Sequence, residues 1–143
     1  MYGAEHKFEL WKIIDMSIKV KKIKPEFIDK RGFISRIIDQ KKIKIRSILY
    51  IESKKGALRG NHYHKKDFHF VYCVSGKFKY SEKDMGKLQP KVYSVILKTG
   101  DLVLTRPMHW HQMEFMEKSI FLAITTETRN QENYEKDTVR DGN

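Results

Sequence analysis

The chain of 143 residues contains a single cysteine, Cys73. One cysteine cannot form a disulfide within the chain, which is the usual situation in a reducing cytoplasm. The sequence also lacks any apolar run of about 20 residues, the length needed to span a bilayer. Its first residues carry Glu5, Glu9 and Asp15 where a secretion signal requires an apolar stretch. These absences predict a cytoplasmic protein without a membrane partner.

Internal repeats, low-complexity segments and long linkers are absent as well. The length is sufficient for one domain with a core, and a hydrophobic fraction of 40% argues against disorder. We therefore expect a single domain over residues 25–143, preceded by an N-terminal extension over residues 1–24. Within the extension Phe8, Trp11 and Ile14 have helical spacing, although a short helix and a strand both remain open.

Negative charge is scarce relative to positive charge. The chain has 29 Lys and Arg against 18 Asp and Glu, a formal net charge of +11, which attracts phosphates and nucleic acids. The lysines are spread as pairs between expected strands, as in solvated turns. The sequence has no basic helix and no aromatic-basic strand pair of the kind that binds single-stranded nucleic acid. We therefore expect no nucleic-acid partner.

From Pro25 onward, short apolar segments alternate with turn signals. We expect strands within residues 27–39 (one strand bent at Gly32), 44–53, 60–64, 68–76, 76–83, 91–97, 102–107, 110–117 and 119–127. The polar tail, residues 128–143, is expected to be extended. About nine short strands predict an all-β protein, either an antiparallel sandwich or a small barrel.

The densest group of chemically active residues lies between Gly56 and Gly76. Side chains alternate faces along a strand, so His62 and His64 project from the same face. Neutral imidazole is the commonest metal ligand, and it also transfers protons near neutral pH. The pair is therefore compatible with a metal site and with acid–base chemistry.

These histidines belong to a longer pattern. His62-x-His64, four residues, His69, six residues and Gly76 resembles the first cupin motif, in which a Glu holds the position of His69. Gly100 and the later segment from Arg106 to His111 resemble the second motif, whose last histidine faces the barrel lumen. The resemblance implies a cupin double-stranded β-helix, or jelly-roll barrel.

A narrower resemblance covers most of residues 25–143. Residues 46–66, RSILYIESKKGALRGNHYHKK, resemble the WxcM-like sugar-nucleotide 3,4-ketoisomerases, and Trp110-His111-Gln112-Met113 is similar to a Trp-His-x-Met segment of that family. PEFIDKRGF (25–33) and GALRGNHY (56–63) are similar to the dTDP-4-dehydrorhamnose 3,5-epimerases. Both families act on nucleotide-linked 4-keto sugars, and both remove a proton next to a ketone.

Four departures from the two family patterns bear on these possibilities. His64 replaces the Gln of the epimerase pattern, and residues 119–127 lack the tyrosine that epimerases use as an acid on a late strand, so the ketoisomerases are favoured. Tyr63 replaces the usual Ala. His69 stands where ketoisomerases carry Gln and metal cupins carry Glu, which keeps a metal site open.

Moving a ketone from C4 to C3 requires a base that removes the C3 proton and a group that returns a proton at C4. The resemblance implies that His62 and His64 carry these protons. Tyr50, if it faces the lumen, would donate to the enediolate oxygen. The candidate substrate-binding residues are Arg59, Arg46 and Arg31 for the diphosphate, Trp110 for stacking on the base, and His111.

The preferred prediction is a cofactor-free isomerase of a nucleotide-linked 4-keto-6-deoxy sugar, most simply a dTDP-sugar, in surface glycan biosynthesis. Its relatives imply a homodimer formed through sheet edges, in which residues 1–24 could be exchanged. The alternative is a metal cupin of the oxygenase or sugar-phosphate isomerase type. There, Zn, Ni, Cu or Fe would bind to His62, His64, His69 and His111. A third possibility is a sugar-binding cupin without catalysis.

Overall fold

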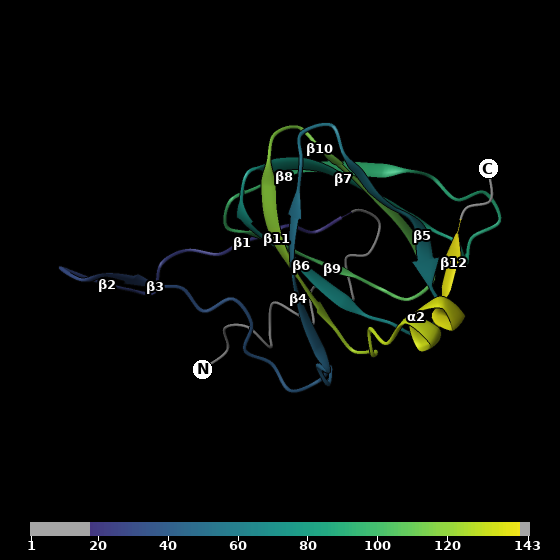
Figure 1. Ribbon diagram of the computed structural model, residues 1–143, viewed down its shortest axis with the longest axis horizontal. Helices are drawn as coiled ribbons and strands as arrows, with labels where there is room; N and C mark the ends of the chain where they lie inside the picture. The colour runs from purple at the N-terminus through teal and green to yellow at the C-terminus, as the bar shows by residue number, and fades with distance from the viewer. Residues whose placement is uncertain (1–17, 141–143) are drawn as a thin grey trace.

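The computed structural model describes residues 18–140 and places most of its strands in two facing antiparallel sheets (Figure 1). The first sheet has the order β1 (Lys21–Lys22), β9 (Asp101–Thr105), β6 (His69–Ser75), β11 (Ser119–Thr125) and β4 (Ser47–Ser53). The second has the order β12 (Thr138–Arg140), β5 (Leu58–His64), β10 (His109–Phe115), β7 (Lys77–Asp84) and β8 (Tyr93–Lys98).

Successive strands repeatedly change sheet along the chain. The strands β4, β6, β9 and β11 belong to the first sheet, while β5, β7, β8 and β10 belong to the second. Eight strands divided between two sheets in this way form a jelly roll. The prediction of an all-β jelly-roll barrel is therefore confirmed.

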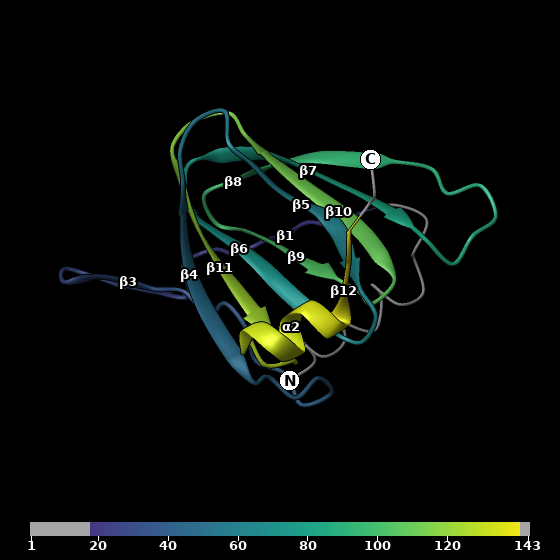
Figure 2. The same cartoon turned by 45° about the vertical axis from the view of Figure 1, so that its right-hand side comes forward.

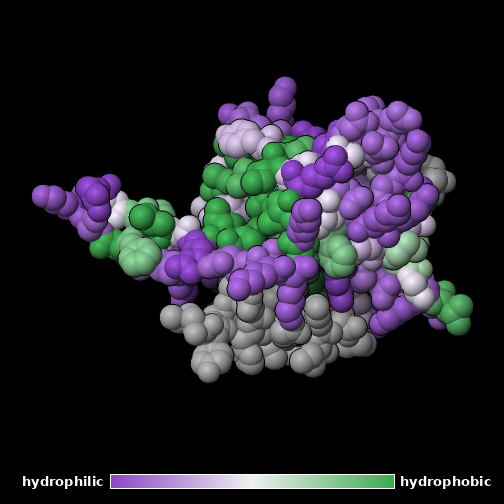
Figure 3. Space-filling model, turned by 90° about the horizontal axis from the view of Figure 1, so that it is seen from below, coloured by the Kyte–Doolittle hydropathy of each residue, from purple (hydrophilic) through white to green (hydrophobic). Residues whose placement is uncertain are grey.

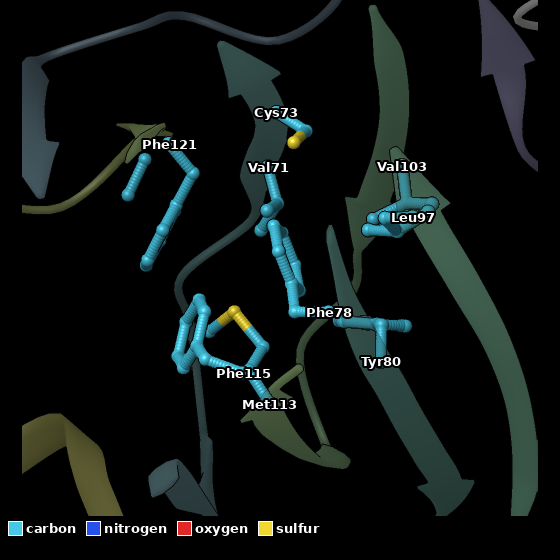
Figure 4. Close-up of a cluster of buried hydrophobic side chains, with 10 residues drawn as sticks. Val71, Cys73, Phe78, Tyr80, Leu97, Val103, Met113, Phe115 and Phe121 are labelled. Carbon is cyan, nitrogen blue, oxygen red and sulfur yellow. The ribbon is translucent and has the colours of Figure 1, made fainter. Parts of the chain in front are cut away.

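The hydrophobic core lies between the two sheets (Figure 4). The rings of Phe78 and Phe115, both from the second sheet, have centroids 4.9 Å apart. Both pack against Phe121 from the first sheet, at 5.6 and 5.7 Å. Cys73 is fully buried in the same cluster, as its alternation with inward-facing residues indicates. This core fills one part of the barrel and leaves the remainder for a cavity.

A second apolar layer covers the outer face of the first sheet. Phe70, Leu102 and Ile124 are buried there. The chain between residues 23 and 45 supplies partly buried isoleucines that pack on them, namely Ile23, Ile37, Ile38, Ile43 and Ile45. Strand β6 is consequently covered on both faces, which explains why its sequence is apolar at both alternating sets of positions.

Residues 27–39 do not form the single bent strand that we predicted. They contain two short strands, β2 (Phe27–Asp29) and β3 (Gly32–Ile34), which pair with each other in a separate two-stranded sheet. This hairpin projects from the barrel as an arm (Figure 1), and its turn is closed by Asp29 accepting from the backbone N–H of Arg31. Gly32 at φ 134° allows the chain to reverse.

The tail is also different from the prediction of an extended segment. It forms the helix α2 (Gln131–Asp137) and the strand β12, and Figure 2 shows α2 lying across one end of the barrel. Asn130 caps the helix through its side chain, and Glu132 pairs with Lys136 one turn later. Strand β12 then pairs with β5, the strand that carries His62 and His64.

The predicted extension is only partly within the described residues. Residues 18–24 include β1, which pairs with β9 of the same chain and so belongs to the barrel. The interpretation of Phe8, Trp11 and Ile14 lies outside the described residues. Within residues 18–140, no helix has the length and apolar character needed to cross a membrane.

Strand β5 contains one extra residue opposite β10. His62 lies opposite His111, and Gly60 lies opposite the next residue of β10, so Asn61 has no partner of its own. Because opposite residues of an antiparallel pair share a face, this bulge allows both Arg59 and His62 to face the cavity although they are three residues apart. Gly60 and Asn61 have φ values of 90° and 59°, which these two residue types tolerate best.

The bulge yields a first prediction. A Cβ atom at Gly60 would lie 2.7 Å from the carbonyl oxygen of His111, whereas a Cβ at Gly56, also at positive φ, would contact nothing within 4 Å. We expect Gly60→Ala to lower the free energy of unfolding by about 1–3 kcal/mol more than Gly56→Ala, because β5 and β10 must separate. Urea denaturation of the two variants measures the difference, and equal losses would show that β5 has room to move.

Candidate functional site

Four imidazoles meet in a cavity of about 320 Å³ between the two sheets. His62 and His64 come from β5, His69 from β6 and His111 from β10. Their ring centroids are 4.8 to 5.6 Å apart in the five pairs that are in contact. The structure therefore brings together the four histidines that the two motifs predict. The rest of the lining consists of Leu49, Ile51, Arg59, Gly60, Val71, Met113, Phe121, Ala123, Arg129, Gln131 and Tyr134.

Three of the four rings are held through Nδ1. His69 Nδ1 is 2.8 Å from Asp67 Oδ2, and His111 Nδ1 is 3.1 Å from the carbonyl oxygen of His109. A carboxylate and a carbonyl can only accept, so each of these nitrogens carries a hydrogen. Nε2 is then the nitrogen of each ring that remains for chemistry in the cavity.

His64 is held in the same way by Thr138, the first residue of β12. The Thr138 hydroxyl donates its one hydrogen to the carbonyl oxygen of Tyr134 at 2.6 Å, so toward His64 Nδ1, 3.1 Å away, it can only accept. His64 therefore carries its hydrogen on Nδ1 and has a lone pair on Nε2. The tail thus fixes the tautomer of a central histidine.

Burial keeps His62, His64 and His111 neutral. Desolvation, followed by the charges of His69, Arg140 and Arg129, lowers the pKa of His62 to about 4. The same main cause lowers the pKa of His64 to about 3, and it places the pKa of His111 well below its usual value. At pH 7 the three rings are proton acceptors, which is also the form that binds a metal.

Asp67 binds the residues that form the wall of the cavity behind His69. Its buried carboxylate accepts from the backbone N–H groups of Thr126 and Glu127 and from Arg129 Nη2 at 3.3 Å, in addition to the bond with His69. Burial alone would raise the pKa of Asp67, but the bond with His69 and the charges of His69 and Arg129 outweigh it and lower the pKa. The carboxylate therefore stays ionised and fixes the positions of His69 and Arg129.

Sequence reasoning missed this wall and the tail residues of the site: Asp67, Arg129, Gln131, Tyr134 and Thr138. A carboxylate two residues before His69 was a signal for Asp67, because side chains two residues apart in an extended chain point the same way and can form a hydrogen bond, as these two do. For the tail, Asn130 followed by Glu132 and Lys136 is the pattern of a short capped helix. Seven residues are too few to predict a helix from propensity alone, so this signal was not decisive.

Two predicted site residues of the strand expected over residues 44–53, Tyr50 and Arg46, do not line the cavity. The acid role predicted for Tyr50 required it to face the lumen, but its side chain is 66% exposed on the outer face of β4, so the expected position in the lumen is wrong. The residues of β4 that face the cavity are Leu49 and Ile51. Arg46 was expected beside Tyr50 and instead lines a separate groove of about 770 Å³ together with lysines such as Lys44.

Trp110 and Arg31 are also away from the histidines. Trp110 is buried on the other face of β10, where its Nε1 donates to Asn61 at 3.0 Å and Lys83 lies over its ring. It supports the bulge of β5 and does not line the cavity. Arg31 is at the exposed tip of the arm and pairs with Asp29 at 2.6 Å. Neither residue is positioned for substrate contact within this chain.

Arg59, by contrast, lines the cavity and remains solvent-exposed. Its Nε donates to Ser53 Oγ at 2.6 Å, and its Nη2 donates to the carbonyl oxygen of Glu52 at 3.1 Å. These bonds hold the guanidinium in place beside β4. An exposed, fixed guanidinium at the edge of a cavity is suited to a phosphate group outside it.

Comparison with known proteins agrees with this architecture. Residues 16–140 match the family model FdtA, described as WxcM-like, C-terminal. The chain belongs to this family. A search of curated protein sequences found no match.

Solved structures with the same fold include members of the two enzyme groups suggested by the motifs. The QdtA 3,4-ketoisomerase from Thermoanaerobacterium thermosaccharolyticum, a double mutant in complex with TDP, is 27% identical, with 88% of each chain covered and a TM-score of 0.67. A 3,4-ketoisomerase from Helicobacter canadensis is 23% identical over 88% of this chain and 92% of that chain (TM-score 0.69). The Mycobacterium tuberculosis rmlC epimerase is 16% identical over 89% and 70% (TM-score 0.74).

The wall behind His69 yields a second prediction. Asp67→Asn removes the charge that compensates Arg129 in a buried position, so we expect a loss of about 3 kcal/mol or more in the free energy of unfolding. Asp29→Asn, which breaks an exposed ion pair in the arm, is the control and should change it little. Chemical denaturation measures both variants. Equal effects would show that Asp67 does not hold this wall together.

Proposed function

We propose that this WxcM-like protein is a 3,4-ketoisomerase of a nucleotide-linked 4-keto-6-deoxy sugar, with a dTDP-sugar as the preferred substrate, in surface glycan biosynthesis. The observation that carries the proposal is the group of four imidazoles inside a small cavity, in which His64, His69 and His111 are held through Nδ1 and keep Nε2 for chemistry. Support comes from the family and from the 27% identical QdtA 3,4-ketoisomerase, which was crystallised with TDP.

The dimensions of the site fit part of such a substrate. A cavity of about 320 Å³ is at the lower end of the range for small-molecule sites, roughly 300–1,000 Å³, so it suits a sugar ring. The nucleotide would then lie outside, with its diphosphate against Arg59. A guanidinium binds phosphate oxygens through paired N–H donors, and this one is already fixed by Ser53.

The proton chemistry needs a base beside C3 and C4. His64 is the best-defined candidate, because Thr138 holds its hydrogen on Nδ1 and leaves the Nε2 lone pair for the sugar. His62 is the second candidate, with its ring 4.8 Å from that of His64. The imidazole that removes the proton from C3 can return it at C4, since the two carbons are adjacent and one base can reach both from the same side of the sugar ring.

A metal cupin is the second candidate function, and one observation favours it. Ligand nitrogens of His62, His64 and His111 lie within 4.8 Å of one another, and His69 adjoins them. Rings held through Nδ1 by a carbonyl, a hydroxyl or a carboxylate, with Nε2 free, are typical of metal sites. The set would suit Zn, Ni, Cu or Fe, which would supply Lewis-acid or redox chemistry.

The third prediction tests the isomerase directly. Protein treated with chelator is incubated in heavy water with dTDP-4-keto-6-deoxyglucose, and the sugar is followed by NMR. We expect deuterium beside the ketone and a 3-keto product. His64→Asn should reduce the rate by about 10²–10⁴-fold, the usual contribution of a positioned base. His109→Asn, a buried histidine outside the cavity lining, is the matched control.

The outcomes separate the candidate functions. Exchange that persists after chelation, and that is lost in His64→Asn but not in His109→Asn, supports the isomerase. No exchange, together with about one tightly bound metal per chain before chelation, would favour the metal cupin. No exchange and no metal, with retained binding of the nucleotide sugar, would indicate a sugar-binding cupin without catalysis.

We propose further that the protein is a homodimer in which the arm packs on a second copy. The arm exposes Phe27, Ile28, Phe33 and Ile34, each more than half accessible. Figure 3 shows an apolar patch on the arm, beside the barrel. A two-stranded hairpin is marginal on its own in water. The outer face of the edge strand β4, where Ile48 and Tyr50 are exposed, is the complementary surface that we propose.

The fourth prediction concerns this dimer. The double variant Phe27→Ser with Phe33→Ser should weaken dimerisation by about 100-fold or more. Burying one Phe contributes roughly 1.5–3 kcal/mol, and 1.4 kcal/mol corresponds to a factor of ten. Sedimentation over a range of concentrations measures the monomer of 17.1 kDa against the dimer. Leu88→Ser, a fully exposed apolar residue between β7 and β8, is the control, and an unchanged double variant would overturn the arm interface.

A further inference from the structure

The cavity has one hydroxyl group among its described lining residues, that of Tyr134. The rest of this lining offers apolar side chains, the four imidazoles, the guanidinium groups of Arg59 and Arg129, and the amide of Gln131. Within residues 18–140 no carboxylate lines it. A ketoisomerase must move a proton between two oxygens as well as between two carbons, and Tyr134 has the chemistry for the oxygens.

Tyr134 is held from several directions. Its backbone N–H donates to the carbonyl oxygen of Asn130 at 2.9 Å, and its carbonyl oxygen accepts from the hydroxyl of Thr138. Its ring is 5.6 Å from the ring of His64, and the guanidinium carbon of Arg129 lies 4.8 Å from its centroid. The tyrosine is thus fixed relative to the proposed base, through the threonine that also holds that base.

We propose that the Tyr134 hydroxyl transfers the proton between the two neighbouring oxygens of the sugar, O3 and O4, during ketoisomerisation. The inference rests on the function proposed above and assigns to Tyr134 the acid role that the sequence had suggested for Tyr50. Arg129 supports it, because a positive charge beside the ring stabilises the negative charge that develops on O4.

The steps balance without a further reactant. An imidazole Nε2 takes the proton from C3, the C–H electrons form a C3–C4 double bond, and O4 takes a proton from the tyrosine hydroxyl. The tyrosine oxygen is restored by the proton of the C3 hydroxyl as the O3 carbonyl forms, and C4 takes the proton from the imidazolium. The product is the 3-keto isomer, and every group of the protein returns to its starting state.

The fifth prediction separates the two proton movements. In Tyr134→Phe the base still removes the C3 proton, and the resulting enediolate is returned to substrate with deuterium, while conversion to the 3-keto product falls by about 10²-fold or more. The exchange-to-conversion ratio measured by NMR in heavy water should therefore rise. Binding of TDP, measured by calorimetry, should not change, because the hydroxyl acts on the sugar.

Tyr63→Phe, on the opposite face of β5 in the strand pair with β12, is the matched control and should convert substrate as the wild type does. Wild-type protein with neither exchange nor conversion would overturn the proposed function, and this inference with it. An active wild type with unimpaired conversion by Tyr134→Phe would overturn only the role of Tyr134. Equal loss of exchange and conversion would also overturn it, because a merely structural role affects both.

Discussion

The site depends on the need of buried imidazole nitrogens for hydrogen-bond partners. A polar group removed from water without a partner costs several kcal/mol, so a cavity with four histidines must supply an acceptor for nearly every Nδ1. Here the acceptors are Asp67, the carbonyl of His109 and the hydroxyl of Thr138. They come from three separate parts of the chain, and together they determine which ring nitrogen is available for chemistry.

This requirement explains why the tail is folded. Without β12, His64 would lack the hydroxyl that it needs, and β5 would be an open edge of the second sheet. Without Arg129, the ionised Asp67 would lose its guanidinium partner in a buried position. Residues 129–140 therefore serve the barrel and the site together, and the tail's polar sequence reflects contacts with polar groups of the cavity wall.

The sequence predicted the barrel and the histidines well because both follow from local rules. Strand periodicity placed His62 and His64 on one face, and motif spacing brought His69 and His111 to them. The same periodicity failed where the chain departs from regular alternation. The bulge at Asn61 brings Arg59 to the face of His62, and no rule of period 2 could show it.

Other features were not predicted because the local sequence is compatible with more than one side-chain orientation or backbone conformation. Strand β4 has apolar residues on both of its faces, so alternation could not tell whether Tyr50 or Leu49 points inward. Trp110 lies in a motif that resembles a family segment, yet its side chain serves the strand bulge. The helix α2 has a cap and an ion pair but only seven residues, and its position depends on tertiary contacts that a sequence pattern does not contain.

The pairing of β12 with β5 also has a consequence for how the protein is made. It joins residues 62–64 to residues 138–140, so the ends of this contact are separated by more than half of the chain. A chain emerging from the ribosome can build the sheets from β4 to β11 before the tail exists, because domains fold as their residues become available. Such a nascent barrel contains the four histidines. It still lacks Thr138, which fixes the tautomer of His64, and the helix α2, which lies across one end of the barrel. Chemical competence would then appear only with the last dozen described residues, and a prematurely terminated chain would be an inert barrel.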